Sequence, residues 1–152
     1  MRNILEIRDL QVHYGGLEAV RGISLDVPEG EIVTLIGANG AGKSSTLRAI
    51  AGLVKPSAGK ISFLDEDITG MDSSLIVSKG ITLVPEGRRI FPDMTVLENL
   101  VEAPVQVQKR NRDEVIEEAK VLLSKVGLLE KAHEYPRRLS GGQQQRVAIA
   151  RA

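Results

Sequence analysis

A glycine-rich segment, Gly37-Ala38-Asn39-Gly40-Ala41-Gly42-Lys43-Ser44, has the residue types that hold a chain of phosphates. It fits the pattern G-x-x-x-x-G-K-[ST], in which glycines let successive backbone N–H groups point into one concavity that binds phosphate oxygens. Lys43 can reach the β- and γ-phosphates, and the Ser44 hydroxyl can ligate Mg²⁺. The segment predicts a site for a nucleoside triphosphate with Mg²⁺; a glycine turn that binds no ligand is the alternative.

A second segment, Leu139-Ser140-Gly141-Gly142-Gln143, predicts another helix start that could bind an anion. Ser140 and Gln143 have the spacing of a capping box, which would open a helix through residues 144–150. Gly141 and Gly142 leave the first turn without side chains, so that a ligand could approach the N–H groups at the positive end of the helix. A capped surface helix with no ligand is the alternative.

The phosphate-binding segment needs a strand before it and a helix after it, and the neighbouring residues predict both. The apolar run 32–36 predicts a buried strand, and the run 45–51 predicts a helix whose N-terminus points at the phosphates. Upstream, residues 4–14 and 19–27 alternate as strands do, and Gly15-Gly16 between them predicts a hairpin turn.

Strand patterns give way to helix patterns near residue 95. Residues 60–64 and 81–84 predict two more strands, with a short helix over 73–79 between them. Thr95 and Glu98 have the spacing of a capping box that opens a helix through about Ala103. Residues from Arg112 to Val126 predict an amphipathic helix from the spacing of Val115, Ile116, Ala119, Leu122, Leu123 and Val126.

Composition limits the classes of partner. The 152 residues carry 20 Lys+Arg and 20 Asp+Glu, so the balance of charge offers no argument for nucleic-acid binding. The absence of cysteine excludes disulfides and thiolate metal sites. No apolar run approaches the ~20 residues of a membrane span, so we expect no direct insertion into a membrane.

The two glycine-bearing motifs together resemble the ATP-binding cassette of ABC transporters, from about Ile4 to Ala152. The resemblance implies an α/β fold, that of a P-loop NTPase cassette with an antiparallel β subdomain, a mostly parallel core sheet that is incomplete here, and a helical subdomain. It divides the chain into an ATP-binding core with the β subdomain over 1–94, a helical subdomain over 95–138, and the second motif with its helix over 139–152.

The resemblance also assigns residues to a shared ATP site. The implied nucleotide-binding residues are Tyr14, Gly37, Asn39, Gly40, Ala41, Gly42, Lys43, Ser44 and Ser45. Tyr14 would stack on adenine, unless it is only a half-buried aromatic residue of its strand. Ser140, Gly141, Gly142 and Gln143 would act in trans on ATP held by a second cassette, which implies a head-to-tail dimer, homomeric or heteromeric, with two sandwiched ATP molecules.

The segment 84–92 corresponds to the loop that couples a cassette to its integral membrane permease subunits. Most cassettes carry Gln where this chain has Glu86, whose carboxylate could ligate Mg²⁺ together with Ser44. Arg88 and Arg89 belong either to this loop's function or to the ordinary solvated surface. The amino-acid sequence of this segment resembles that of the ATPases of branched-chain amino acid importers. Residues 144–147 instead resemble the corresponding residues of polar amino acid importers.

No residue of this chain is assigned a catalytic role. The family's Mg²⁺-organising Asp, catalytic Glu and switch His would lie beyond Ala152, and His13 and His133 match none of them. We therefore expect a truncated, marginally stable cassette without steady-state ATPase activity of its own. The resemblance implies the ATP-binding subunit of an amino acid importer, with branched-chain amino acids as the expected substrates, at the cytoplasmic face of the cell membrane. The alternatives are a nucleotide-binding fragment that does not hydrolyse ATP, and a cassette of a DNA-repair or translation machine.

Overall fold

The computed structural model describes residues 2–85, 87 and 90–152, and the chain divides into two compact units, Met1–Leu83 and Val84–Ala152. The elements are β1 (Asn3–Tyr14), β2 (Leu17–Pro28), α1 (Lys43–Ile50), β3 (Ala58–Phe63), β4 (Glu66–Asp67), α2 (Ser73–Ser78), α3 (Val96–Gln106), α4 (Arg112–Lys125), the 3₁₀ turns η1 (Leu129–Lys131) and η2 (Pro136–Arg138), and α5 (Gly141–Arg151). Among the described residues, no helix is both long enough and apolar enough to cross a membrane.

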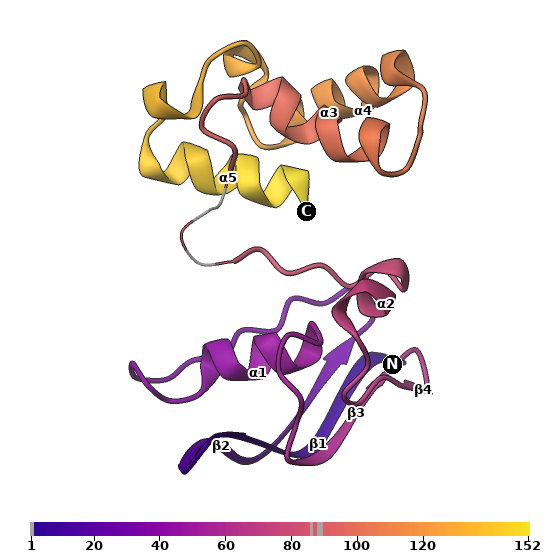
Figure 1. Cartoon of the computed structure of the whole chain (residues 1–152), viewed down its shortest axis with the longest axis vertical. Helices are drawn as coiled ribbons and strands as arrows, with labels where there is room; N and C mark the ends of the chain where they lie inside the picture. The colour runs from indigo at the N-terminus through magenta and orange to yellow at the C-terminus, as the bar shows by residue number, and fades with distance from the viewer. Residues whose placement is uncertain (1, 86, 88–89) are drawn as a thin grey trace. The chain divides into compact units, whose positions relative to one another are not determined.

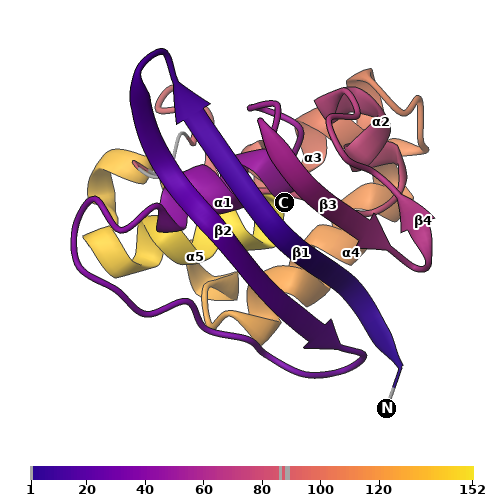
Figure 2. The same cartoon turned by 90° about the horizontal axis from the view of Figure 1, so that it is seen from below.

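The first unit is an antiparallel sheet with the strand order β2-β1-β3-β4, and α1 lies across one of its faces (Figures 1 and 2). The expected hairpin is confirmed, because β1 and β2 pair from Asn3 opposite Pro28 to Tyr14 opposite Leu17. The helix expected over 45–51 and the strand expected over 60–64 are also present, as α1 and β3, with ends shifted by one or two residues.

A bulge in β1 brings the hydrophobic residues of this strand onto one face. Ile7 and Leu10 are both fully buried although they are three residues apart, because the pairing with β2 slips between them. Asp9 takes a positive φ of 47° at this point. Gly59 of β3 lies so close that a Cβ there would be 2.4 Å from the Asp9 carbonyl oxygen. The buried face that α1 covers therefore depends on this irregularity.

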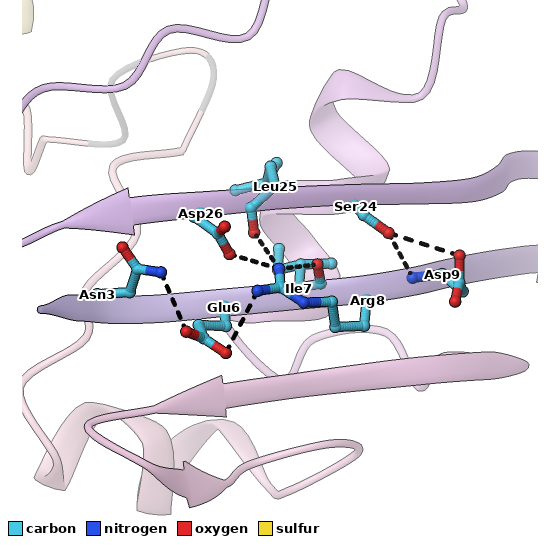
Figure 3. A network of polar contacts seen from close by, with 8 residues as sticks. All are labelled: Asn3, Glu6, Ile7, Arg8, Asp9, Ser24, Leu25 and Asp26. Atoms are coloured by element: carbon cyan, nitrogen blue, oxygen red, sulfur yellow. Dashed lines mark hydrogen bonds and ion pairs between the residues drawn. The ribbon is translucent and has the colours of Figure 1, made fainter.

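On the other face of β1, Arg8 joins the two strands of the hairpin (Figure 3). Its guanidinium donates to the backbone carbonyls of Ile7 at 3.0 Å and Leu25 at 3.4 Å, and it pairs with the carboxylates of Glu6 and Asp26. Since these side chains are nearly half exposed, the ion pairs add little to stability. The network instead favours one register of β1 against β2.

The second unit is a small helical assembly around one apolar core. Its buried residues are Val96, Leu100, Val101, Val115, Ala119, Leu123, Leu128, Ala132, Leu139 and Val147. The capping box of Thr95 and Glu98 is confirmed at the start of α3, which continues to Gln106. The amphipathic helix is confirmed as α4, although Leu122 is 40% exposed and only three of the expected apolar positions are buried.

Two expected strands are not formed. Residues 31–38 and 81–85 have no strand assignment, and the side chains of Ile32 and Ile36 are each 94% exposed. A strand exists only when a neighbour accepts and donates its backbone hydrogen bonds, and no described segment pairs with either run. The strand pairs among the described residues are therefore all antiparallel.

Candidate functional site

The glycine-rich segment forms an exposed loop that turns directly into α1. Gly42 is the N-cap and has a φ of 87°, and its carbonyl oxygen accepts from the Thr46 N–H at 2.8 Å and the Thr46 hydroxyl at 3.0 Å. Ala41 N–H donates to the Ala38 carbonyl at 3.2 Å, which closes the turn before the helix. The positive end of the helix dipole is thus directed at the loop.

Two glycines of the loop lie where an added side chain would be crowded, and at Gly42 it would collide with the backbone. A Cβ on Gly42 would lie 2.4 Å from the Ala19 carbonyl oxygen and 3.0 Å from Val20 Cγ2, both in β2. Ala19 is skipped in the pairing of β1 with β2, so its peptide forms a bulge at this point. A Cβ on Gly37 would lie 3.1 Å from that of Ala41, across the loop. In this tight cradle glycine is therefore required at Gly42, where the backbone has a positive φ and approaches β2, whereas a side chain at Gly37 would need Ala41 to shift slightly.

Lys43 folds back over the cradle. Its ammonium group donates to the carbonyl oxygens of Gly37 and Ala38, each at 2.7 Å. A phosphate in the loop would offer charged acceptors to the same ammonium group, and such hydrogen bonds are stronger than those to neutral carbonyls. Lys43, Ser44 and Ser45 are half-buried in the first turn of α1. The residues present therefore fit a bound polyphosphate.

The described residues fit Mg²⁺ only as part of such a complex. They contain no group of three or more acidic or histidine side chains that could hold a metal ion. Mg²⁺ commonly takes one or two protein ligands and completes its shell with phosphate oxygens and water. Ser44 could supply one ligand; Glu86, like Arg88 and Arg89, lies outside the described residues.

A cavity of about 340 Å³ lies beside the phosphate loop, between its tip and the beginning of β2. Its lining residues are Glu18, Ala19, Val20, Arg21, Ile23, Gly40 and Ala41. Glu18 pairs with Arg21 at 3.4 Å and with His13 at 3.8 Å. Tyr14, 41% exposed, lies at the same end of the hairpin. The β2 wall was missed by sequence reasoning, because residues 18–21 carry no motif.

The second motif begins α5 in the expected way. Ser140 is the N-cap, its hydroxyl oxygen accepts from the Gln143 N–H at 3.3 Å, and the Gln143 side-chain oxygen accepts from the Ser140 N–H at 2.8 Å. The capping box is therefore confirmed. Gly141 and Gly142 are exposed, and a Cβ on Gly142 would meet open space. The phosphate loop and this motif belong to different units, and their functional roles stay predictions.

Comparison with known proteins identifies the family. Residues 20–152 match the family model described as ABC transporter. The arginine transport ATP-binding protein ArtM of Bacillus subtilis is 45% identical over 150 residues, 98% of this chain and 62% of that protein. The histidine transport ATP-binding protein HisP of Pseudomonas aeruginosa is 40% identical over 161 residues, 97% of this chain and 63% of that protein. The chain thus spans less than two thirds of the length of these relatives.

Solved structures agree with that assignment. The ADP conformation of MJ1267, an ATP-binding cassette of an ABC transporter, is 28% identical with a TM-score of 0.85, over 99% of this chain and 64% of that one. The dimeric structure of MJ0796, a bacterial ABC transporter cassette, is 32% identical with a TM-score of 0.83, over 97% of this chain and 68% of that one. The α/β cassette fold expected from the sequence is confirmed. The chain therefore belongs to the ABC transporter family, as an ATP-binding cassette.

Proposed function

We propose that this chain binds ATP with Mg²⁺ through its phosphate loop and serves in an importer of amino acids. The observation that carries the proposal is the cradle itself, in which Gly42 packs against β2 and the Lys43 ammonium group lies over the Gly37 and Ala38 carbonyls. In the bound state Lys43 exchanges these carbonyls for phosphate oxygens. Ser44 ligates Mg²⁺, and Tyr14 stacks on the base.

The phosphate-binding residues proposed here are Gly37, Asn39, Gly40, Ala41, Gly42, Lys43, Ser44 and Ser45. An equilibrium titration with a fluorescent ATP analogue tests them directly. The Lys43→Ala chain should bind at least about tenfold more weakly, since a charge-assisted hydrogen bond contributes roughly 1.5–3 kcal/mol. Lys60→Ala is a matched control, because Lys60 is an exposed lysine of β3 paired with Asp67. Equal affinity of the Lys43 variant and the unaltered chain would refute the nucleotide site.

A second cassette completes the proposed site. Ser140, Gly141, Gly142 and Gln143 of one cassette face the γ-phosphate of ATP held by the other. Two observations support this role. The first turn of α5 is exposed and has no side chains at Gly141 and Gly142. The similar cassette MJ0796 forms a dimer. Gly142→Val in the complete cassette should abolish ATP-dependent dimerisation measured by light scattering, whereas ATP binding to the monomer should persist.

The membrane subunits are the other proposed partners, and they place the protein at the cytoplasmic face of the cell membrane. The coupling contact is assigned to the segment 84–92, with Glu86 as its Mg²⁺ ligand and sensor. The names of ArtM and HisP, both transport ATP-binding proteins, support an association with a transporter. Crosslinking of a cysteine at Phe91 to co-expressed permease subunits would test this contact, with a cysteine at Leu53 as the control.

The transported substrate is proposed to be an amino acid. The segment 84–92 favours a branched-chain substrate, whereas the names of ArtM and HisP concern arginine and histidine. Uptake of labelled leucine, arginine and histidine into vesicles that contain the complete transporter separates these possibilities. Preference for leucine supports the branched-chain assignment, and preference for a cationic amino acid replaces it.

A nucleotide-binding chain without turnover is the second candidate. No residue of this chain is assigned as the general base that activates water, and the similar proteins are longer than this chain. The 152-residue chain should then hydrolyse ATP no faster than its Lys43→Ala variant. Turnover that disappears in that variant would show that the chain supplies a base of its own.

A further inference from the structure

Phe91 is held by two helices of the second unit at once. Its N–H donates to the Asn99 side-chain oxygen at 2.7 Å, and its carbonyl accepts from the Asn99 amide nitrogen at 3.0 Å, so α3 fixes its backbone. The guanidinium carbon of Arg151, the last residue of α5, lies 5.0 Å from the centroid of the Phe91 ring. That distance is typical of a cation–π contact.

Asn99 makes the backbone attachment rigid. It is only 1% exposed, and its amide nitrogen also donates to the carbonyls of Met94 at 3.2 Å and Thr95 at 3.0 Å. A buried amide with such partners is costly to separate from them. The main chain from Phe91 to Thr95 is therefore bound to the first turns of α3, whereas Phe91 as a whole residue remains 49% exposed.

The helix that contacts the ring is the same helix that begins at the second motif. α5 extends from Gly141 to Arg151, with Ser140 as its N-cap. An 11-residue α-helix is about 16 Å long and moves as one body on the scale of its own length. A displacement of the N-terminus of α5 at Ser140 therefore also moves its C-terminus at Arg151, and no other helix or strand is needed to transmit it.

We propose that Arg151 is a positioning residue that couples the Phe91 ring to movements of α5 through the cation–π contact. This inference rests on the proposed function, in which Ser140–Gln143 engage ATP and Phe91 lies in the segment that meets the membrane subunits. Engagement of phosphate at one end of α5 then changes the position of Phe91 at the other end. The exposed part of Phe91 is the apolar surface that passes the change to the membrane partner.

The test uses the complete cassette reconstituted with its membrane subunits. Arg151→Met keeps an unbranched side chain without the charge, and Phe91→Leu keeps an apolar side chain without the ring face. Each should lower the number of amino acids transported per ATP hydrolysed by about threefold to tenfold. Basal ATPase activity without substrate should stay near the unaltered value in Arg151→Met. Arg151→Lys should retain most of the coupling, because an ammonium group also binds to a ring face.

The double variant tests whether the two residues act together. Arg151→Met with Phe91→Leu should lose no more coupling than either single variant, because both remove the same contact. Arg138→Met is the matched control, since Arg138 pairs with Glu134 at 3.1 Å and does not touch Phe91. The Arg138→Met complex should transport as many amino acids per ATP hydrolysed as the unaltered complex.

Three outcomes would overturn the inference. These are unchanged coupling in Arg151→Met and Phe91→Leu, a double variant whose loss is the product of the single losses, and an equal loss in Arg138→Met. The unaltered complex distinguishes this failure from failure of the proposed function. If the unaltered complex transports amino acids with ATP and the variants transport as many amino acids per ATP hydrolysed, only the inference about Arg151 fails. If it transports none, the proposed function fails and the inference fails with it.

Discussion

The two glycine-bearing helix starts of this cassette are built in different ways. Gly42 begins α1 without a capping side chain, and its conformation depends on β2, which lies far from it in the sequence. Ser140 begins α5 with a reciprocal capping box whose partner, Gln143, is three residues away. The first start is held by tertiary contact and the second by local hydrogen bonds. A change in the sheet should therefore disturb the phosphate loop and leave the start of α5 intact.

The largest effect expected from this difference is that of Gly42→Ala. Its Cβ would lie 2.4 Å from the Ala19 carbonyl oxygen, in a backbone conformation that side chains disfavour. We expect a loss of about 3 kcal/mol in the free energy of unfolding of the first unit, together with loss of nucleotide binding. Gly40→Ala is the control, since Gly40 has a φ of 83° but open space around it, and should cost only about 1 kcal/mol.

Urea denaturation and hydrogen exchange would check these two variants. Protection of amides in α5 should be the same in both, because its start makes no use of β2. If Gly42→Ala and Gly40→Ala lowered the free energy of unfolding equally, the close approach of Gly42 to the Ala19 carbonyl oxygen would contribute nothing to the shape of the phosphate loop.

The next largest effect concerns the second unit alone. Asn99→Ala removes the acceptor of the Phe91 N–H and the donor to three carbonyls, and should destabilise this unit by about 2–3 kcal/mol. Asn111→Ala is the control, because Asn111 is an exposed N-cap of α4 and should cost about 1 kcal/mol. Hydrogen exchange resolved by peptide is the measurement. Loss of protection in β1 as large as in α3 would contradict the separate support of the two units.

A smaller effect separates the structural from the proposed phosphate-binding role of Ser140. Ser140→Ala should cost about 1 kcal/mol of helix stability, whereas Ser140→Asp should cost almost nothing, since Asp is an equally good N-cap. The carboxylate would nevertheless repel a phosphate. The complete cassette with Asp at this position should therefore melt normally and fail to dimerise with ATP. Normal dimerisation of that variant would place the phosphate elsewhere.

The smallest expected effect is a pH dependence that distinguishes the two capping boxes. The Thr95 N–H, which donates to the Glu98 carboxylate at 2.7 Å, lowers the pKa of Glu98, whereas the box of α5 uses the neutral Gln143. The stabilisation by ionised Glu98 is complete above its unfolded-state pKa of about 4.3 and is lost as pH falls through the lower folded-state pKa.

Glu98→Gln should therefore be less stable than the unaltered chain at pH 7, and the difference should shrink as the solution is acidified below about pH 4. Chemical denaturation at several pH values measures it. Gln143→Glu is the companion variant, which should introduce the same dependence into α5. A constant difference between Glu98→Gln and the unaltered chain would show that ionisation of this box does not affect stability.

Sequence reasoning succeeded where structure depends on near neighbours. The turn at Gly15-Gly16 and the capping boxes at Thr95 and Ser140 are short-range patterns, and each forms as expected. The apolar run 32–36 has the composition of a buried strand, yet Ile32 and Ile36 are 94% exposed. Composition reports a preference for strand, and pairing needs a partner that local pattern does not reveal.

The same distinction holds at the site. The phosphate loop is evident from its residues, but its wall in β2 is not, because Ala19 contributes a carbonyl oxygen that any residue would possess. Asn99 was likewise missed, since nothing in the spacing of α3 marks it as buried and fully hydrogen-bonded. Both are long-range or backbone effects, which residue type alone does not encode.

The bulge at Asp9 has a consequence for how this chain tolerates length changes. From Leu10 onward the side chains of β1 alternate in a phase that the extra residue has reset, with Val12 buried and Tyr14 on the same side two residues later. Deleting one of the two residues between Ile7 and Leu10 would restore regular pairing with β2 and would leave Leu10, Val12 and Tyr14 on their present faces, because residues two apart share a face. The bulge is thus the one stretch of β1 where the loss of a residue leaves the buried pattern intact, whereas the same deletion after Leu10 would turn the following side chains, the proposed adenine platform among them, to the opposite face.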